Sequence, residues 1–337
     1  MISRPLLPSV TRSAVVLVAA SGLLLADSSP AAAQGSADAY PARPVRMLIG
    51  YAPGTSVDVA GRFLAQRLGE VFGQSFVVDN RPGATGAIAA EAVARSAPDG
   101  YTLMAAPGSG VVATPWMQKV GWDPLRDFAP VALMGEFAFL LAAHPTLPAK
   151  TAKDLIALAR QRPRELAYGS NGVGSAFHLA GVLFAQMGKV ELVHVPYRGG
   201  GNAALVDVMG GQIHLLWNSP VFLIPQIKAG KLKAIGVTGP KRIAALPDVP
   251  TLAESGLPGY AMTGWQGVFA PASTSRDIVT RLNATIVKIL TAPAARETWA
   301  AQGLEAPAWS PDQFAQRVKA DYEAYGRLIR SIGVSPE

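Results

Sequence analysis

Short apolar runs alternate along the chain with amphipathic segments, and Gly- or Ser-rich loops separate them. Residues 45–51 are apolar throughout except for Arg46, and 59–68 then repeat apolar positions at helical spacing. The same succession recurs to the end of the chain. The predicted strands are 45–51, 76–78, 101–105, 131–143, 166–168, 193–195, 213–217, 232–238 and 265–269, and the predicted helices are 59–68, 87–95, a stretch after Thr151, 176–187, 202–209, 278–290 and 311–329. Strands that alternate with helices indicate βαβ units and therefore an α/β fold with mainly parallel sheets.

Two helix starts are marked by their side chains. Thr151 precedes Asp154 by three positions, which resembles a capping box. Ser310 is followed by Pro311 and then by Gln313, so Ser, Pro and Gln occupy the N-cap, N1 and N3 positions of a predicted helix.

The first 33 residues have the pattern of a secretory signal peptide. Arg4 and Arg12 supply a basic segment, 14–26 is apolar, and 31–33 are three Ala residues that suit cleavage before Gln34. The apolar stretch is too short to span a bilayer. We therefore expect export to the periplasm and a soluble mature protein.

Composition narrows the classes of function. The 337 residues contain no Cys, which excludes disulfides, thiolate metal sites and Cys nucleophiles. The net charge of +7 is spread along the chain without a Lys/Arg run, so nucleic-acid binding is not expected. A mildly positive protein suits an anionic small molecule, although charge alone fits a generic basic surface equally well.

Three loops share a design that favours anion binding. The loops 53–56, 169–175 and 197–201 each follow a predicted strand, are rich in Gly, Ser or Thr, and open a helix. The first N–H groups of a helix lack intrahelical partners and attract negative charge. Each loop alone is equally explained as a capped turn, but three together indicate a ligand site at the carboxyl ends of the strands.

Signatures of enzymes are weak. No loop is a P-loop or a complete dinucleotide fingerprint, Ser170 is not in a nucleophile elbow, and the four His residues have no metal spacing. We expect neither a catalytic residue nor a metal or other cofactor. His178 is open to either a ligand role or a packing role, His194 is interpreted as structural, and Asp58 either caps its helix or orients a ligand.

Several segments, taken in order, resemble a known family. They are 40–45 (YPARPV), 52–54 (APG) with Asp58, 77–84 (VVDNRPGA), 98–103 (PDGYTL), 195–199 (VPYRG), 246–251 (LPDVPT) and 254–259 (ESGLPG). The chain resembles the solute receptors of tripartite tricarboxylate transporters, the Bug family, over nearly its whole mature length. The resemblance implies a two-lobed periplasmic binding protein of type II, with a cleft that holds small carboxylates through backbone N–H groups and water.

Two positions depart from the family pattern. Thr55 stands where the family usually has a second Gly, and Asn218 stands where an Asp is common. Together with the neighbouring Trp217, the loss of this charge makes an aromatic or amide-bearing carboxylate a plausible ligand, although Trp217 is equally explained by core packing. The expected ligand-binding residues are Gly54, Thr55, Ser56, Asp58, Ser109, Ser170, Asn171, Gly174, Ser175, His178, Tyr197, Arg198, Gly199, Gly200 and Asn218.

The resemblance also sets the domain plan and the function. One lobe is expected to comprise 36–140 and 262–337, and the other 141–261. The function is capture of a small dicarboxylate or aromatic carboxylate by a monomer, for membrane subunits of a transporter or for a sensor kinase. The alternative is a hydrolase or transferase that acts on a small carboxylate or ester.

Overall fold

The computed structural model describes residues 40–197, 201–301 and 303–331. The strands are β1 (Val45–Ile49), β2 (Phe76–Asn80), β3 (Thr102–Pro107), β4 (Phe128–Ala138), β5 (Leu140–Ala143), β6 (Ala167–Ser170), β7 (Val193–Pro196), β8 (Leu215–Asn218), β9 (Lys233–Val237) and β10 (Thr263–Pro271). The helices of more than one turn are α1 (Ser56–Phe72), α2 (Ala87–Ala94), α3 (Gly108–Val112), α4 (Ala152–Gln161), α5 (Ala176–Gly188), α6 (Gly201–Met209), α7 (Pro220–Lys228), α8 (Arg276–Thr291), α9 (Pro293–Ala301) and α10 (Pro311–Ser331). The predicted signal peptide lies outside the described residues.

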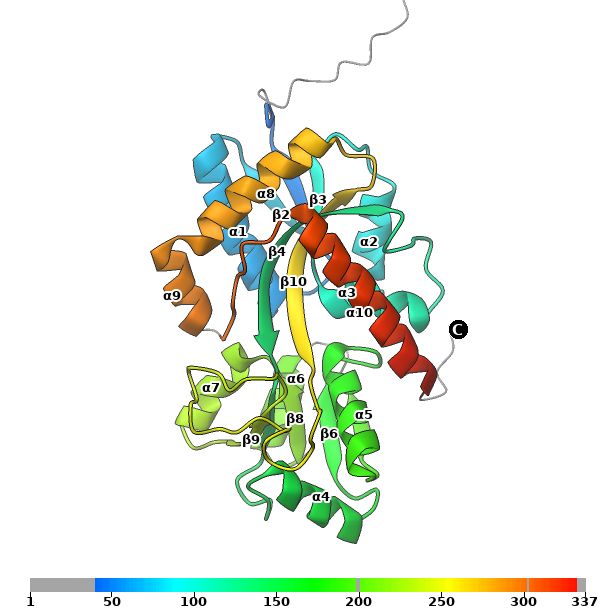
Figure 1. The fold of residues 1–337 in the computed structure, drawn as a ribbon, viewed down its shortest axis with the longest axis vertical. Coiled ribbons are helices and arrows are strands. Elements are labelled where there is room, and N and C mark those ends of the chain that lie inside the picture. The colour runs from blue at the N-terminus through cyan, green and yellow to red at the C-terminus, as the bar shows by residue number, and fades with distance from the viewer. Residues whose placement is uncertain (1–39, 198–200, 302, 332–337) are drawn as a thin grey trace, which may run out of the picture. The chain divides into compact units, whose positions relative to one another are not determined.

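The strands form two five-stranded sheets. Figure 1 shows the labelled strands of both sheets among the helices that pack on them. The first sheet has the order β2-β1-β3-β10-β4 and the second the order β7-β6-β8-β5-β9. In the first, β1 pairs in parallel with β2 and β3, whereas β10 is antiparallel to both β3 and β4. In the second, β6 is parallel to β7 and β8, whereas β5 is antiparallel to β8 and β9. The βαβ units are parallel as predicted, and the antiparallel pairs come from strands next to the passages between the sheets.

Helices cover both faces of each sheet, and the apolar positions of the strands explain why. Met47 and Ile49 of β1 belong to one core with α1 and α8, while Leu48 belongs to another core with α2, α3 and α10. Successive side chains of a strand point to opposite faces, so a strand buried on both faces is apolar at every interior position. In the second sheet, α4 and α5 cover one face and α6 and α7 the other. The two-lobed α/β fold is therefore confirmed.

Both predicted helix starts are present. Thr151 and Asp154 form a reciprocal capping box at α4, and Ser310 and Gln313 exchange the same pair of hydrogen bonds before α10. Helices α3, α7 and α9 were not predicted, although Ser219 and Pro220 occupy the same N-cap and N1 positions at α7 as Ser310 and Pro311 do at α10. Pro225 lies inside α7, where Pro usually interrupts a helix. None of the described helices is long and apolar enough to cross a membrane.

The chain passes between the sheets twice, once from β4 to β5 and once from β9 to β10. Thr238, fully buried, ties the two passages together. Its hydroxyl donates to the Met262 carbonyl at 2.6 Å and accepts the Phe139 N–H at 2.8 Å, and the Thr238 N–H donates to the Phe139 carbonyl at 2.9 Å. One side chain therefore holds both passages at the same point.

We predict that Thr238→Val lowers the free energy of unfolding by about 2–3 kcal/mol, because the buried Phe139 N–H and Met262 carbonyl would lose a partner. Chemical denaturation measures this change. The control is Thr274→Val: Thr274 is also buried, but its hydroxyl has no hydrogen-bond partner among the described residues, so the change should be within about 0.5 kcal/mol. Equal effects of the two variants would contradict the role of Thr238.

Candidate ligand-binding site

A cavity of about 510 Å³ lies at the carboxyl ends of the parallel strands and is lined from both sheets. This is the edge at which open α/β sheets collect ligands, and the volume is in the range of small-molecule sites. The first sheet and the loops and helices around it contribute 50–53, 55–57, 82–85, 107–109, 263–265 and Tyr325. Phe137, near the end of β4, and Phe139, in the passage to β5, also line the cavity. The second sheet and its loops and helices contribute 171–173, 175–177, Asn218 and Phe222. None of these lining residues is charged.

Helices α1, α3, α5 and α7 all begin at this cavity, and three of them start without a side-chain cap. The N-cap residues Thr55, Pro107 and Ser219 make no side-chain cap hydrogen bond to α1, α3 and α7. By contrast, Thr151 caps α4 and Ser275 caps α8, both away from the cavity. The first-turn N–H groups of α1 and α3 therefore have neither an intrahelical partner nor a capping side chain.

The loop before α5 is intermediate. The Ser175 hydroxyl accepts the His178 N–H at 3.2 Å, which satisfies one donor of the first turn. Ala176 and Phe177, which precede it in that turn, line the cavity. Three helices without a side-chain cap and one helix capped by Ser175 thus begin at the same cavity.

The predicted site residues fall into three groups. Those that line the cavity are Thr55, Ser56, Ser109, Asn171, Ser175 and Asn218. Those that lie in the same loops but outside the lining are Gly54, Asp58, Ser170, Gly174, His178 and Tyr197. Arg198, Gly199 and Gly200 lie outside the described residues.

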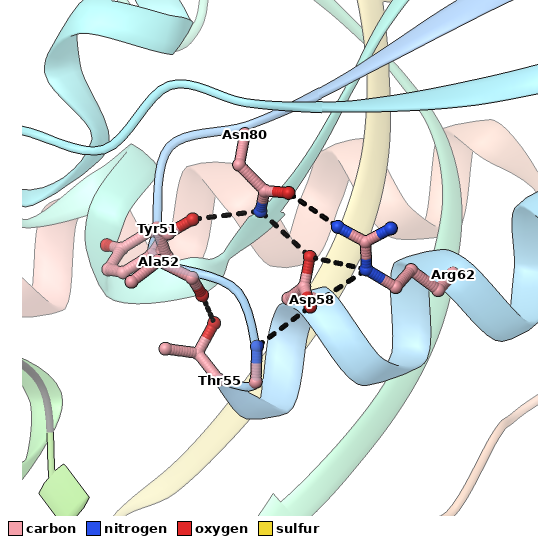
Figure 2. A network of polar contacts seen from close by, with 7 residues as sticks. Tyr51, Ala52, Thr55, Asp58, Arg62 and Asn80 are labelled. Carbon is pink, nitrogen blue, oxygen red and sulfur yellow. Dashed lines mark hydrogen bonds and ion pairs between the residues drawn. The ribbon is translucent and has the colours of Figure 1, made fainter.

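Asp58 holds the first loop in shape instead of facing the cavity. Its carboxylate accepts the Gly54 N–H at 2.9 Å, the Asn80 amide at 2.8 Å and the Arg62 guanidinium at 3.0 Å, as Figure 2 shows. Burial acts to raise the pKa of Asp58, but the hydrogen bonds from Arg62, Gly54 and Asn80 outweigh it and lower the pKa. The Asn80 amide also donates to the Tyr51 carbonyl at 3.0 Å, so the loop is fixed to both β1 and β2.

Thr55, the last residue of this loop, uses its hydroxyl as a hydrogen-bond donor. Its hydroxyl donates to the Ala52 carbonyl at 2.9 Å, which directs the hydroxyl proton away from the start of α1 (Figure 2). The capping bond that a Thr at this position usually accepts is absent. The side chain still lines the cavity.

The loop 170–175 rests on two stacked imidazoles. His178 and His194 have ring centroids 4.0 Å apart, the Nδ1 atom of His178 accepts the Gly174 N–H at 3.1 Å, and Nε2 of His194 lies 2.7 Å from the Ser170 hydroxyl. Burial lowers the pKa of His178 to about 4, and burial together with the neighbouring His178 lowers that of His194 to about 3. Both rings are therefore neutral at pH 7.

The Ser170–His194 contact has the atoms of a nucleophile–base pair, which the sequence did not reveal. Ser170 is fully buried, and its hydroxyl also lies 3.0 Å from the Gly172 carbonyl and accepts the Gly172 N–H at 3.1 Å. Because neither Ser170 nor His194 lines the cavity, the pair shapes the loop and presents no nucleophile to a ligand. Tyr197 likewise turns away, donating its hydroxyl to Asp207 at 2.6 Å.

Aromatic side chains form much of the cavity wall, and sequence reasoning missed them. They are Tyr51, Phe137, Phe139, Phe177, Phe222, Trp265 and Tyr325. Trp217, by contrast, is fully buried and packs edge-on against Tyr168 at 5.2 Å, so it belongs to the core of the second lobe. The loop 82–85 was also missed, although its position after a strand end could have indicated it. Among the described residues, no group of three His, Asp or Glu side chains could hold a metal ion.

We predict that Asp58→Asn lowers the free energy of unfolding by about 2 kcal/mol at pH 7, because the charge-assisted bonds to Gly54 and Arg62 are weakened. The lowered pKa of Asp58 means that its contribution is present above about pH 4 and is lost as the pH falls further, so parent and variant should converge in acid. Denaturation at several pH values measures this. Glu70→Gln on the same helix, in an exposed pair with Arg67, is the control and should change little.

We also predict that the stacked imidazoles make the free energy of unfolding fall in mild acid. Unfolded His titrates near pH 6.5, whereas the pKa of His178 in the folded protein is about 4. Between these values the unfolded chain takes up protons that the native state does not, so the free energy of unfolding should fall as the pH drops from about 6.5 to about 4. His178→Asn, which keeps an acceptor for the Gly174 N–H, should reduce this slope. His144→Asn, at a histidine outside the loop, is the control, and an unchanged slope in His178→Asn would count against the prediction.

Comparison with known proteins agrees with this geometry. The family model described as tripartite tricarboxylate transporter family receptor matches residues 60–334. The chain is 35% identical to BugT of Bordetella pertussis over 319 residues, which are 94% of this chain and 97% of BugT. Among solved structures, R. palustris Rpa4515 with adipate has a TM-score of 0.83 at 37% identity, covering 88% of this chain and 100% of that one. MatC from Rhodopseudomonas palustris with bound malate has a TM-score of 0.79 at 30% identity, covering 86% and 100%. The chain belongs to the tripartite tricarboxylate transporter receptor family.

Proposed function

We propose that this protein is a periplasmic receptor that captures a small organic carboxylate whose body is apolar. The observation that carries the proposal is a single cavity that joins uncapped helix starts to an uncharged, largely aromatic wall. The helix starts would bind the carboxylate, and the rings would bind the rest of the ligand. The capture is for delivery to the membrane subunits of a transporter or to a sensor.

The helix starts account for recognition of an anion without a cation in the wall. The N–H groups of Ser56 and Val57 are in the first turn of α1, where the helix dipole adds positive potential. Ser109 adds a hydroxyl group beside the start of α3, whereas the Ser175 hydroxyl already donates to the Gly172 carbonyl at 2.9 Å. A carboxylate placed among these donors replaces the water that it loses with charge-assisted hydrogen bonds.

The aromatic wall argues for the kind of body that the ligand carries. Phe137, Phe139 and Phe177 form a continuous cluster, with Phe139 and Phe177 edge-on at 4.9 Å. Rings of this kind favour flat or extended apolar groups and leave hydroxyl groups unpaired. Two relatives were solved with carboxylates, one with adipate and one with malate. A linear dicarboxylate such as adipate or an aromatic carboxylate suits this wall better than the hydroxylated malate.

The two-lobed arrangement provides the means of enclosure. The lobes are proposed to have the predicted limits, 36–140 with 262–337 and 141–261, and to move about the passages near Thr238. They touch beyond the cavity, where Met117 packs so closely on Gly174 that a Cβ at Gly174 would lie 2.3 Å from its sulfur. Gly174 also has a φ of +81°, which favours glycine.

The alternative function, a hydrolase or transferase, gains no support from the site. Its best candidate pair, Ser170 and His194, is turned away from the cavity, and the family is one of receptors. We infer that the protein binds its ligand without converting it, as a monomer and without a cofactor. Removal of residues 1–33 on export is part of the same proposal.

A panel of matched acids and amides tests this function. We expect adipate and benzoate to raise the melting temperature in a concentration-dependent way, because a ligand bound only by the native state stabilises it by RT ln(1 + [L]/Kd). Adipamide and benzamide have similar shapes without the charge and should leave the melting temperature unchanged. Stabilisation by the amides or by neutral sugars, with none from the acids, would refute the anion site. Mass spectrometry of the incubated acids should recover them unchanged, and turnover would favour the enzyme.

A further inference from the structure

Trp265 is a ring of the cavity wall with contacts on several sides. It lies on β10 and is 2% exposed, and its indole meets Phe314 edge-on with centroids 5.2 Å apart. The ring also lies so close to Gly108 that a Cβ there would be 2.4 Å from it, which only a glycine avoids. Its Nε1–H donates to Oδ2 of Asp321 at 2.6 Å. Contacts from α3 and α10 therefore fix the ring from different sides.

Asp321 is in turn held by Arg317, one turn earlier on α10. The Nε–H of Arg317 donates to the same Oδ2 atom at 2.8 Å. The guanidinium also bonds to Glu136 on β4 and donates to the Thr263 hydroxyl on β10 at 3.2 Å. Thr263 lines the cavity together with Trp265. One ion-pair network thus connects the C-terminal helix, the cavity wall and the two long strands that lead toward the second sheet (Figure 1).

Burial of a tryptophan in this fold does not require such a network. Trp122 is buried against Phe128, and its Nε1 has no hydrogen-bond partner among the described residues. A carboxylate at the indole N–H of Trp265 therefore does more than satisfy a core residue, because it fixes the ring in one orientation. Fixed rings that border a cavity decide which ligand shapes fit without further rearrangement.

We propose that Asp321 is a positioning residue that holds the indole of Trp265 as a rigid wall of the ligand cavity, and that this wall selects among carboxylates by the shape of their apolar body. The inference rests on the proposed function, since it concerns the ligand of the same cavity. Trp265 touches the ligand, whereas Asp321 acts only through Trp265.

Two substitutions at Asp321 separate its hydrogen bonds from its charge. Because a single carboxylate oxygen accepts from both Trp265 and Arg317, the amide oxygen of Asp321→Asn can accept both bonds, whereas Asp321→Leu removes them. With adipate, benzoate and malate as probes in isothermal titration, we expect Asp321→Leu to weaken the tightest probe about tenfold and to alter the ranking of the three. Asp321→Asn should retain the parent ranking within about threefold. The control is Asp312→Leu, on the same helix as Asp321, which removes an exposed pair with Arg276 of α8 and should leave all three affinities unchanged.

A double-mutant cycle tests whether Asp321 acts through the indole. Trp265→Phe keeps an aromatic ring but removes the N–H, and it should alter the probe ranking by itself. In that background Asp321→Leu should change the affinities no further, which a general loss of stability would not produce. The indole N–H resonance of Trp265, identified by its absence in Trp265→Phe, should shift on addition of the tightest probe and should move in Asp321→Leu.

The outcomes separate the two claims. Suppose that the parent binds the probes but Asp321→Leu leaves their affinities unchanged, as Asp312→Leu should. The positioning role is then wrong and the proposed function stands. The same holds if Asp321→Leu changes the affinities equally in the parent and in the Trp265→Phe background. If Asp321→Leu does not fold, Trp265→Phe decides, because an unchanged probe ranking in that variant overturns the inference. If the parent binds none of the acids, the proposed function fails and the selectivity wall fails with it.

Discussion

The first-turn N–H donors of α1 and α3 meet no capping side chain among the described residues, because neither Thr55 nor Pro107 makes a side-chain cap bond, and the architecture of the site follows from this. The Thr55 hydroxyl donates to the Ala52 carbonyl. Asp58, the charge nearest to those donors, is bound instead by Gly54, Arg62 and Asn80. A carboxylate that stayed free at this point would compete with an anionic ligand. The hydrogen bonds from the loop to Asp58 therefore do two things. They shape the start of α1, and they keep the Asp58 carboxylate from competing with the ligand.

The sequence predicts which loops line the cavity better than it predicts which of their side chains face it. Placing loops at the carboxyl ends of strands needs only the alternation of strand and helix, and Thr55, Ser109, Asn171 and Ser175 line the cavity for that reason. The direction of a side chain depends on partners that are distant in sequence. His178 on α5 accepts a bond from Gly174 and stacks on His194, which belongs to strand β7. Asp58 finds Asn80 on β2, and no local pattern near Asp58 indicates this.

The aromatic wall was unpredictable for a related reason. Phe137 and Phe139 lie in a stretch that looked like one continuous strand, and the break between β4 and β5 places both of them beside the cavity. Tyr325 is nearly 200 residues away from the closest of these along the chain and joins the wall because α10 packs on the first sheet. The predicted preference for an aromatic ligand was attached to Trp217, which is a core residue. We still propose an aromatic carboxylate as a candidate ligand, because other aromatic side chains line the cavity.

The wall and the passages between the lobes are made from the same segments. Phe139 bonds through its backbone to Thr238 and presents its ring to the cavity, while Thr263 and Trp265 follow directly after Met262, the other partner of Thr238. A ligand that packs on these rings therefore contacts the segments about which the lobes would move. On the proposed function, the shape of the ligand would act on the passages directly, without a separate chain of contacts to transmit the signal. A body that fits the wall would favour closure of the lobes, whereas a body that displaces Phe139 or Trp265 would strain the segments that must hold it.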